Sequence, residues 1–161
     1  MSIQLTIDRV GFEPITDNDL EFLEKVYRST REEEISRAPW SEEDKAHFIH
    51  HQFLAQHTFY SEQFSDAKFD IIFVDGQKAG RLYIEEREDE LRIIDIALLP
   101  AFRGQGWGTK LLEEIKLLAE KKTKSVGIHV EKNNPAMSLY IRLGFKDIED
   151  KGVYQFMKWT S

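Results

Sequence analysis

The stretch Phe102-Arg103-Gly104-Gln105-Gly106-Trp107-Gly108-Thr109 decides the fold of this chain. An apolar run from Ile93 to Leu99 precedes it, and an amphipathic helical pattern follows it. Strand, glycine loop and helix therefore follow one another here. Glycines just ahead of a helix leave backbone N–H groups uncovered, and the helix dipole favours negative charge at the same place. The stretch predicts a cradle for a diphosphate.

The two commonest nucleotide-binding loops do not fit this pattern. A P-loop requires Gly-x-x-x-x-Gly-Lys-Ser/Thr, and counting from Gly104 leads to Thr109 and Lys110 with no second glycine in register. A dinucleotide fingerprint requires Gly-x-Gly-x-x-Gly, but the third glycine is Gly108, one position too early. The pattern that remains is an arginine, two variable residues, Gly106, one variable residue and Gly108.

Length, charge and composition limit the function. A chain of 161 residues is most economically one domain, residues 1–161. Its net charge of −7 argues against binding to nucleic acid or to an anionic membrane, and an amine substrate fits better. The absence of cysteine excludes disulfides, thiol catalysis and Cys-ligated zinc, so we expect the cytoplasm. We see no signal peptide or membrane-spanning run.

Periodicity and turn signals predict the order β, α, α, β, β, β, loop, α, β, α, β, β. Helical crossovers imply parallel pairing near the glycine loop, whereas hairpins imply antiparallel pairing elsewhere. We therefore expect an α/β fold, a mixed sheet with helices on its faces. The expected strands are 3–7, 69–74, 78–85, 91–99, 125–130, 145–148 and 153–159, and the expected helices are 17–30, 42–64, 107–122 and a short one from Pro135 to Gly144.

A second motif follows the glycine loop: Asn133-x-x-Ala136-x-x-Leu139-Tyr140-x-x-x-Gly144-Phe145. Together the two motifs resemble the GNAT superfamily of N-acetyltransferases, whose acetyl-coenzyme A loop has the same arginine and glycine spacing. The resemblance is detailed over residues 69–159, whereas residues 1–66 match only in element order. It implies a mixed, mostly antiparallel central sheet of about seven strands, flanked by helices and splayed between the fourth and fifth strands.

The resemblance also implies acetyl-coenzyme A as cosubstrate, with no metal. Loop amides at a helix N-terminus supply donors to a pyrophosphate, and Arg103 adds a forked cation. In the family, the end of the preceding strand and an asparagine opposite bond the pantetheine arm. The expected cofactor-binding residues are Ile96, Ala97, Leu98, Arg103, Gly104, Gln105, Gly106, Trp107, Gly108, Thr109, Asn133, Ala136 and Tyr140.

Catalysis in this family is direct attack by an amine on the thioester. Tyr140 occupies the family's general-acid position, and a phenol can protonate the leaving thiolate. A lysine-like amine with a pKa of about 10.4 also needs a base. Asp95, which interrupts an apolar run, is our first candidate, followed by Glu85 and His129. The alternative for Tyr140 is that it is an aromatic residue of the core without a catalytic role. The alternative for Asp95 is that it is a buried, paired carboxylate with a structural role only.

The acceptor is not identified by the sequence. Substrate pockets in this family are built largely from the part that matches weakly, where Tyr27, Arg31 and Trp40 are candidates beside Glu85 and His129. A small-molecule or peptide amine is expected, with no nucleic acid or membrane as partner. A homodimer is a further expectation from the family. The alternative function is a non-catalytic acyl-coenzyme A sensor or interaction module on the same fold.

Overall fold

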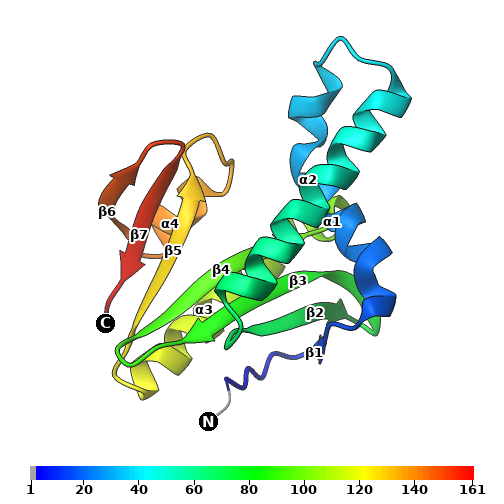
Figure 1. Ribbon diagram of the computed structural model, residues 1–161. Coiled ribbons are helices and arrows are strands. Elements are labelled where there is room, and N and C mark those ends of the chain that lie inside the picture. The colour runs from blue at the N-terminus through cyan, green and yellow to red at the C-terminus, as the bar shows by residue number, and fades with distance from the viewer. Residues whose placement is uncertain (1–2) are drawn as a thin grey trace.

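The computed structural model describes residues 3–161 and contains a seven-stranded mixed sheet (Figure 1). The strand order is β1-β2-β3-β4-β5-β7-β6, in which only the β4–β5 pair is parallel. The predicted α/β fold with a mostly antiparallel sheet is confirmed. The strands are β1 (Val10–Pro14), β2 (Lys68–Val74), β3 (Gln77–Glu86), β4 (Glu90–Leu98), β5 (Ser125–Glu131), β6 (Lys146–Lys151) and β7 (Tyr154–Trp159).

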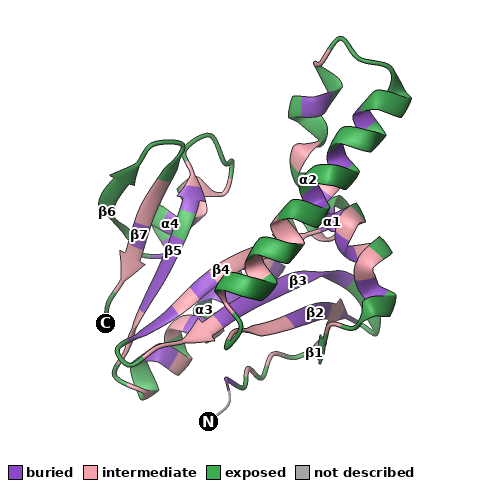
Figure 2. Cartoon of the chain, in the orientation of Figure 1, coloured by how far each residue is buried: buried purple, intermediate pink, exposed green. Residues whose placement is uncertain are grey.

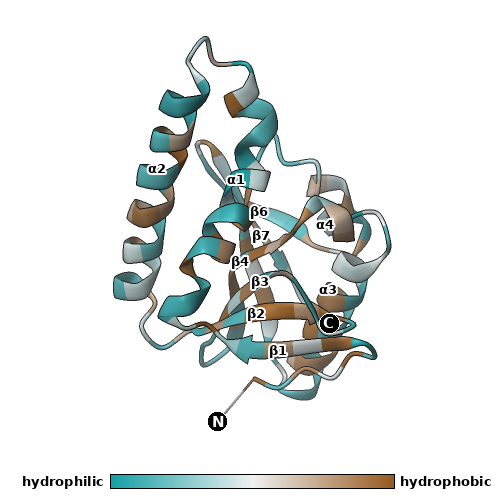
Figure 3. Cartoon of the chain, turned by 90° about the vertical axis from the view of Figure 1, so that its right-hand side faces the viewer, coloured by the Kyte–Doolittle hydropathy of each residue, from teal (hydrophilic) through white to brown (hydrophobic). Residues whose placement is uncertain are grey.

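Helices cover both faces of the sheet. Helices α1 (Leu20–Ser36) and α2 (Glu42–Gln63) form a hairpin on one face, and α3 (Trp107–Lys121) and α4 (Met137–Arg142) lie on the other (Figure 3). The end of the hairpin extends beyond the sheet and is mostly exposed (Figure 2). No helix within residues 3–161 has the length and apolar character needed to cross a membrane.

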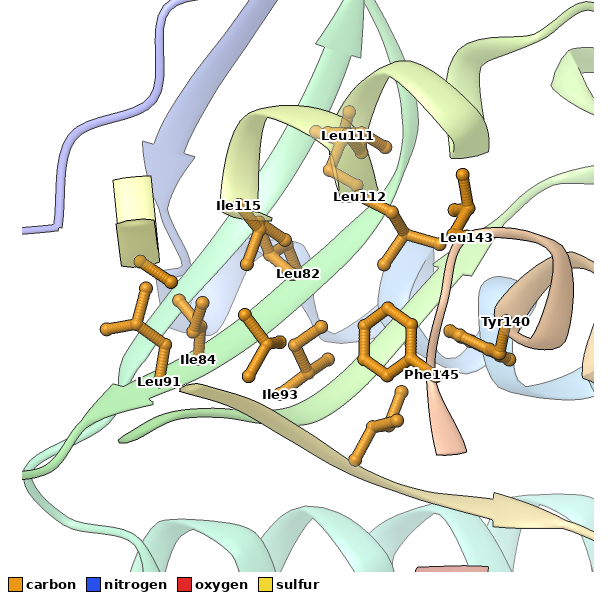
Figure 4. Packing of buried hydrophobic residues seen from close by; sticks show 14 of the residues in the cluster. Leu82, Ile84, Leu91, Ile93, Leu111, Leu112, Ile115, Tyr140, Leu143 and Phe145 are labelled. Atoms are coloured by element: carbon orange, nitrogen blue, oxygen red, sulfur yellow. The ribbon is translucent and has the colours of Figure 1, made fainter. Parts of the chain in front are cut away.

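Each face of the sheet has its own hydrophobic core. On the α3–α4 side, Leu112 and Ile115 of α3 pack with Leu82 and Ile93 of the sheet (Figure 4). On the hairpin side, a smaller cluster joins the helices to β2 and β3. Burial of a large aliphatic side chain contributes roughly 1.5–3 kcal/mol. The larger core therefore anchors the helix that follows the glycine loop.

The fourth and fifth strands separate halfway along their length. Their parallel pairing runs from Glu90↔Ser125 to Ile93↔Ile128 and stops there. At the same point the β3–β4 register shifts, because Tyr83 pairs with Asp95 and the next residue pairs with Ile93, which leaves Ile94 as a bulge. A bulge increases local twist and bends the strand. The predicted splay is confirmed, and it leaves one edge of the second half of β4 free of β5.

The first strand was predicted wrongly. Residues 3–7 are not a strand, although Ile3 is buried, and β1 instead lies at Val10–Pro14, where it includes Gly11 and Pro14. The strand lies at the edge of the sheet and has β2 as its neighbouring strand, and an edge position tolerates proline because one side of the backbone needs no partner.

Two helix boundaries also differ from expectation. Helix α1 continues to Ser36 through the charge-dense segment, because pairs such as Arg28–Glu32 support a helix across one turn. The short helix α4 begins at Met137 rather than at Pro135, since the Asn134 side chain accepts from the Ala136 N–H and closes a turn ahead of it.

Candidate active site

A groove of about 1740 Å³ opens where β4 and β5 diverge and continues onto the hairpin side of the sheet. Ligand sites in proteins are commonly concave hollows of this kind. The groove is lined by all the expected cofactor-binding residues except Gln105 and Trp107: Ile96, Ala97, Leu98, Arg103, Gly104, Gly106, Gly108, Thr109, Asn133, Ala136 and Tyr140.

The glycine loop presents an uncapped helix end to this groove. Gly104 and Gly106 have φ angles of 71° and 86°, which glycine adopts without strain. Gly106 is the N-cap of α3 and supplies no side chain, and the first bonded amide of the helix is that of Lys110. The amides of the first turn therefore lack intrahelical acceptors. A Cβ built at Gly104 or Gly106 meets no atom within 4 Å, so this surface is open to a ligand.

Arg103 is held beside the loop by two elements. Its Nε donates to the Leu98 carbonyl at 2.8 Å, and its Nη2 donates to the Ser29 hydroxyl of α1 at 3.2 Å. Burial lowers the pKa of Arg103, but a guanidinium remains charged in proteins. A fixed cation next to free helix amides suits a pyrophosphate, so these residues fit the diphosphate of coenzyme A.

The side chains of Gln105 and Trp107 turn away from the groove. Trp107 is buried in the larger core, and its indole N–H donates to the Gln105 side chain at 3.3 Å. The Gln105 amide in turn donates to the Ala101 carbonyl at 2.7 Å. Only the backbone of these two residues remains a candidate for phosphate binding.

Tyr140 lies at the edge of the core, where its ring meets Phe145 edge-on at 5.6 Å (Figure 4). The residue also lines the groove. Burial raises the pKa of Tyr140, and the negative charge of Asp95 raises it further. The phenol therefore keeps its proton at neutral pH and is available as a donor.

Asp95 follows the bulge in β4 and also lines the groove. Its Oδ2 accepts from Nη2 of Arg81 at 2.6 Å, and the same nitrogen donates to Gln56 of α2 at 2.9 Å. Our sequence reasoning missed both partners. The available signal for Arg81 was a cation in the middle of β3, where residues 79–84 are otherwise apolar and Arg81 shares one face of the strand with Tyr83.

The three candidate bases do not lie together. Glu85 accepts from the Arg87 side chain at 2.7 Å and is not among the residues that line the groove. His129 lines the groove and packs against Phe156 with the two rings tilted and their centroids 4.9 Å apart. Burial lowers the pKa of His129, and the nearby positive charge of Arg92 adds to this effect. Asp95 and His129 are thus the two candidates that face the groove.

The three substrate candidates from the N-terminal part line one hollow of about 650 Å³ at the end of the hairpin. Arg31 bonds Glu131 of β5 at 2.7 Å and lies over the Tyr27 ring, 5.6 Å from its centroid. Tyr27, Arg31 and Glu131 also line the large groove. The two hollows therefore meet at the Arg31–Glu131 ion pair.

The outer wall of the small hollow is apolar. Trp40 packs edge-on against Phe48 at 5.2 Å, and Val153 and Tyr154 face them from the turn into β7. All four side chains are exposed, Trp40 to 44% and Val153 to 68%. Exposed apolar clusters of this kind mark binding surfaces.

No set of three or more metal-ligating side chains comes together anywhere in residues 3–161. Of the four histidines between positions 47 and 57, His50 contacts Glu24 at 2.6 Å, and His57 stacks on Phe53.

Comparison with known proteins identifies the family. The model of the acetyltransferase (GNAT) domain matches residues 65–147. A ribosomal-protein alanine N-acetyltransferase of Haemophilus influenzae is 26% identical over 113 residues, which cover 70% of this chain and 75% of that protein.

Solved structures share the fold. The PaiA N-acetyltransferase of Thermoplasma acidophilum, in complex with coenzyme A, matches with a TM-score of 0.67 and 22% identity, over 94% of this chain and 99% of that one. A ribosomal-protein alanine N-acetyltransferase of Escherichia coli matches with a TM-score of 0.61 and 21% identity, over 94% and 93%. With both motifs and the splayed sheet in place, this chain belongs to the GNAT family and is an N-acetyltransferase.

Proposed function

We propose that this acetyltransferase binds acetyl-coenzyme A where β4 and β5 diverge and acetylates a primary amine that enters from the hairpin side. The observation that carries the cosubstrate assignment is the uncapped N-terminus of α3, which opens onto the groove next to Arg103. The free edge of β4 from Asp95 to Leu98 offers backbone groups to an extended pantetheine arm. Asn133 lines the same groove from the opposite side.

We further propose that Tyr140 is the general acid. The bound thioester supplies an activated acetyl carbonyl. The acceptor nitrogen forms a bond to the carbonyl carbon and the carbon–sulfur bond breaks, while Tyr140 gives its proton to the departing sulfur. The proton that the amine loses restores the phenol through solvent, so protons balance. Our first choice for the group that contacts the amine is Asp95. His129 is the alternative, because both side chains face the groove.

The acceptor that we propose is an amine carried by a peptide or protein. The hollow of Trp40, Phe48, Val153 and Tyr154 offers an apolar wall next to the Arg31–Glu131 junction, which suits an apolar side chain adjacent to the reacting amine. A relative named as a ribosomal-protein alanine N-acetyltransferase is consistent with this class.

The cosubstrate claim is tested by isothermal titration calorimetry with acetyl-coenzyme A and, separately, by thiol release with a panel of amines. We expect binding in the micromolar range and the highest turnover with peptides whose first residues are apolar. Absence of heat would reject the cosubstrate site. Binding without turnover on any peptide, polyamine or aminoglycoside would instead reject the acceptor proposal and favour a sensor.

Three broader predictions accompany this function. We propose that residues 1–161 act as one domain, since the seven strands form a single sheet. We retain the cytoplasm as the compartment because the chain lacks cysteine. A homodimer is also retained, with the exposed edge strand β6 as the candidate contact.

A further inference from the structure

A buried arginine lies beneath the middle of the groove. Arg81 of β3 is only 3% exposed, and its Nη2 donates to Asp95 and to Gln56. Its Nε has no hydrogen-bond partner within residues 3–161. The guanidinium lies 5.1 Å from the centroid of the Tyr83 ring. Burying a permanently charged guanidinium costs free energy that its partners must offset. The carboxylate of Asp95 is the partner that supplies the opposite charge.

That partner is the one acidic candidate base in the groove. The Asp95 side chain is 17% exposed and stands directly after the bulge, where β4 has left β5. Neutralising this carboxylate by a proton would leave the guanidinium of Arg81 buried without a counter-charge. Asp95 is therefore a poor final acceptor for a proton. It is well placed to bond a cation from the groove, because a carboxylate accepts several hydrogen bonds at once.

The phenols around the pair and the imidazole of His57 are neutral at pH 7. Burial raises the pKa of Tyr60 on α2, Tyr140 on α4 and Tyr154 on β7, and the charge of Asp95 adds to each increase. Burial likewise raises the pKa of Tyr83 to about 12. Burial lowers the pKa of His57 on α2, and so does the charge of Arg81. The charge of Asp95 thus acts on four neutral phenols, and Arg81 is its ion-pair partner within residues 3–161.

We propose that Arg81 and Gln56 position the Asp95 side chain so that its carboxylate binds the acceptor as an ammonium ion, and that the ammonium proton then leaves to water. This inference rests on the proposed function. The overall balance is one ammonium ion and one thioester giving one amide, one thiol and one proton released to solvent. Arg81 is a positioning residue in this scheme, because it acts only through Asp95.

The scheme also selects the class of amine. Without a strong base, the acceptor must lose its proton to water, which favours an amine of low pKa. An α-amino group has a pKa of about 7.7–8.0, whereas a lysine side chain has one of about 10.4. We therefore infer that the enzyme prefers a peptide N-terminus to a lysine side chain, by roughly two orders of magnitude in kcat/KM near neutral pH.

The test measures kcat and KM for a short peptide with an apolar first residue between about pH 6 and pH 9.5. For Asp95→Asn we expect KM at pH 7 to rise about tenfold or more, with kcat at saturation changed less than about threefold. A fall in kcat of about 100-fold at unchanged KM would make Asp95 the proton acceptor and overturn the proposal.

Variants of Arg81 distinguish a positioning role from a purely structural one, because only a positioning role changes the pH dependence of KM. Arg81→Gln removes the cation that pairs with Asp95 and favours its charged form, so we expect KM to be raised near neutral pH and to return toward the parent value as pH increases. Arg81→Lys keeps a cation and should keep the parent's pH profile. In the Asp95→Asn background, Arg81→Gln should add no pH-dependent change. A loss of activity in Arg81→Gln that is equal at every pH would contradict the positioning role.

Two controls separate this proposal from folding and from the proposed function. His57→Gln should show the parent profile, which excludes the imidazole as the source of the pH effect. Every variant should bind coenzyme A within about twofold of the parent, and a larger change would identify a folding defect. Failure of the proposed function would appear in the parent itself, as absence of turnover. The choice of amine is tested with a peptide whose N-terminus is blocked by acetylation and whose lysine side chain is free. If this lysine reacts as well as a free N-terminus, the inferred preference is overturned.

Discussion

The glycine loop with α3 and the α1–α2 hairpin build their parts of the groove in different ways. The loop offers backbone amides, which a glycine pattern and a helix start make available at adjacent positions. The hairpin offers side chains, which meet residues far away in the chain, as Arg31 meets Glu131 and Gln56 meets Arg81. A site made of local backbone is visible in a sequence motif, whereas a site made of distant side chains is not.

The largest effect is expected at Tyr140 of α4, which lines the groove that both regions share. Tyr140→Phe removes only the hydroxyl, so we expect kcat to fall about 100-fold or more because the departing sulfur loses its proton donor. The ring that packs on Phe145 is kept, and coenzyme A affinity should stay within about twofold by calorimetry. Unchanged turnover would remove Tyr140 as the acid and leave it as a core aromatic.

The next effect tests the loop. Arg103→Ala should weaken coenzyme A binding about 10- to 100-fold, since charge-assisted bonds to a phosphate contribute about 1.5–3 kcal/mol. Arg103→Lys should recover only part of this affinity, because lysine lacks the fork. Arg87→Gln is the matched control, since Arg87 pairs with Glu85 and does not line the groove. Equal losses in the control and in Arg103→Ala would indicate general electrostatics rather than a phosphate site.

A smaller effect tests the hairpin. Trp40→Ala should raise KM for a peptide with an apolar first residue about five- to tenfold, because part of the apolar wall is lost. Coenzyme A affinity should not change. Leu54→Ala is the control, since Leu54 is an exposed apolar residue of α2 outside both hollows. If the two variants behave alike with peptides and with small amines, the acceptor does not use this wall.

The smallest effect concerns the start of the hairpin. Burial opposes the charge of Asp19, but bonds from the Thr16 N–H at 2.8 Å and from Lys78 at 3.0 Å outweigh it and lower the pKa of Asp19. A lowered folded-state pKa stabilises the fold above the unfolded value and loses that contribution as pH falls through the folded value.

Asp19→Asn should therefore cost about 1 kcal/mol in urea unfolding at pH 7 and much less near pH 2. The same cost at both pH values would show that the charge of Asp19 contributes nothing. In that case only the shape of the cap would matter.

The elements themselves were largely predictable, and the errors have local causes. Periodicity located α2, α3 and β2 to β5 within a few residues, because buried faces impose a regular apolar spacing. The prediction of the first strand was wrong because it followed the apolar alternation at residues 3–7. The true strand contains Gly11 and Pro14, which an edge strand accepts. The predicted start of α4 was wrong because the turn closed by the Asn134 side chain precedes the helix and does not cap it.

The sequence by itself determined the family, the order of the elements and the loop whose amides open onto the groove, since each depends on neighbouring residues and on local backbone conformation. Only the tertiary structure decided that Asp95 is paired with Arg81, that Glu85 lies outside the groove and that Tyr27, Arg31 and Trp40 share one hollow. Such contacts arise when strand register and helix packing bring distant side chains together. No spacing along the chain encodes that proximity.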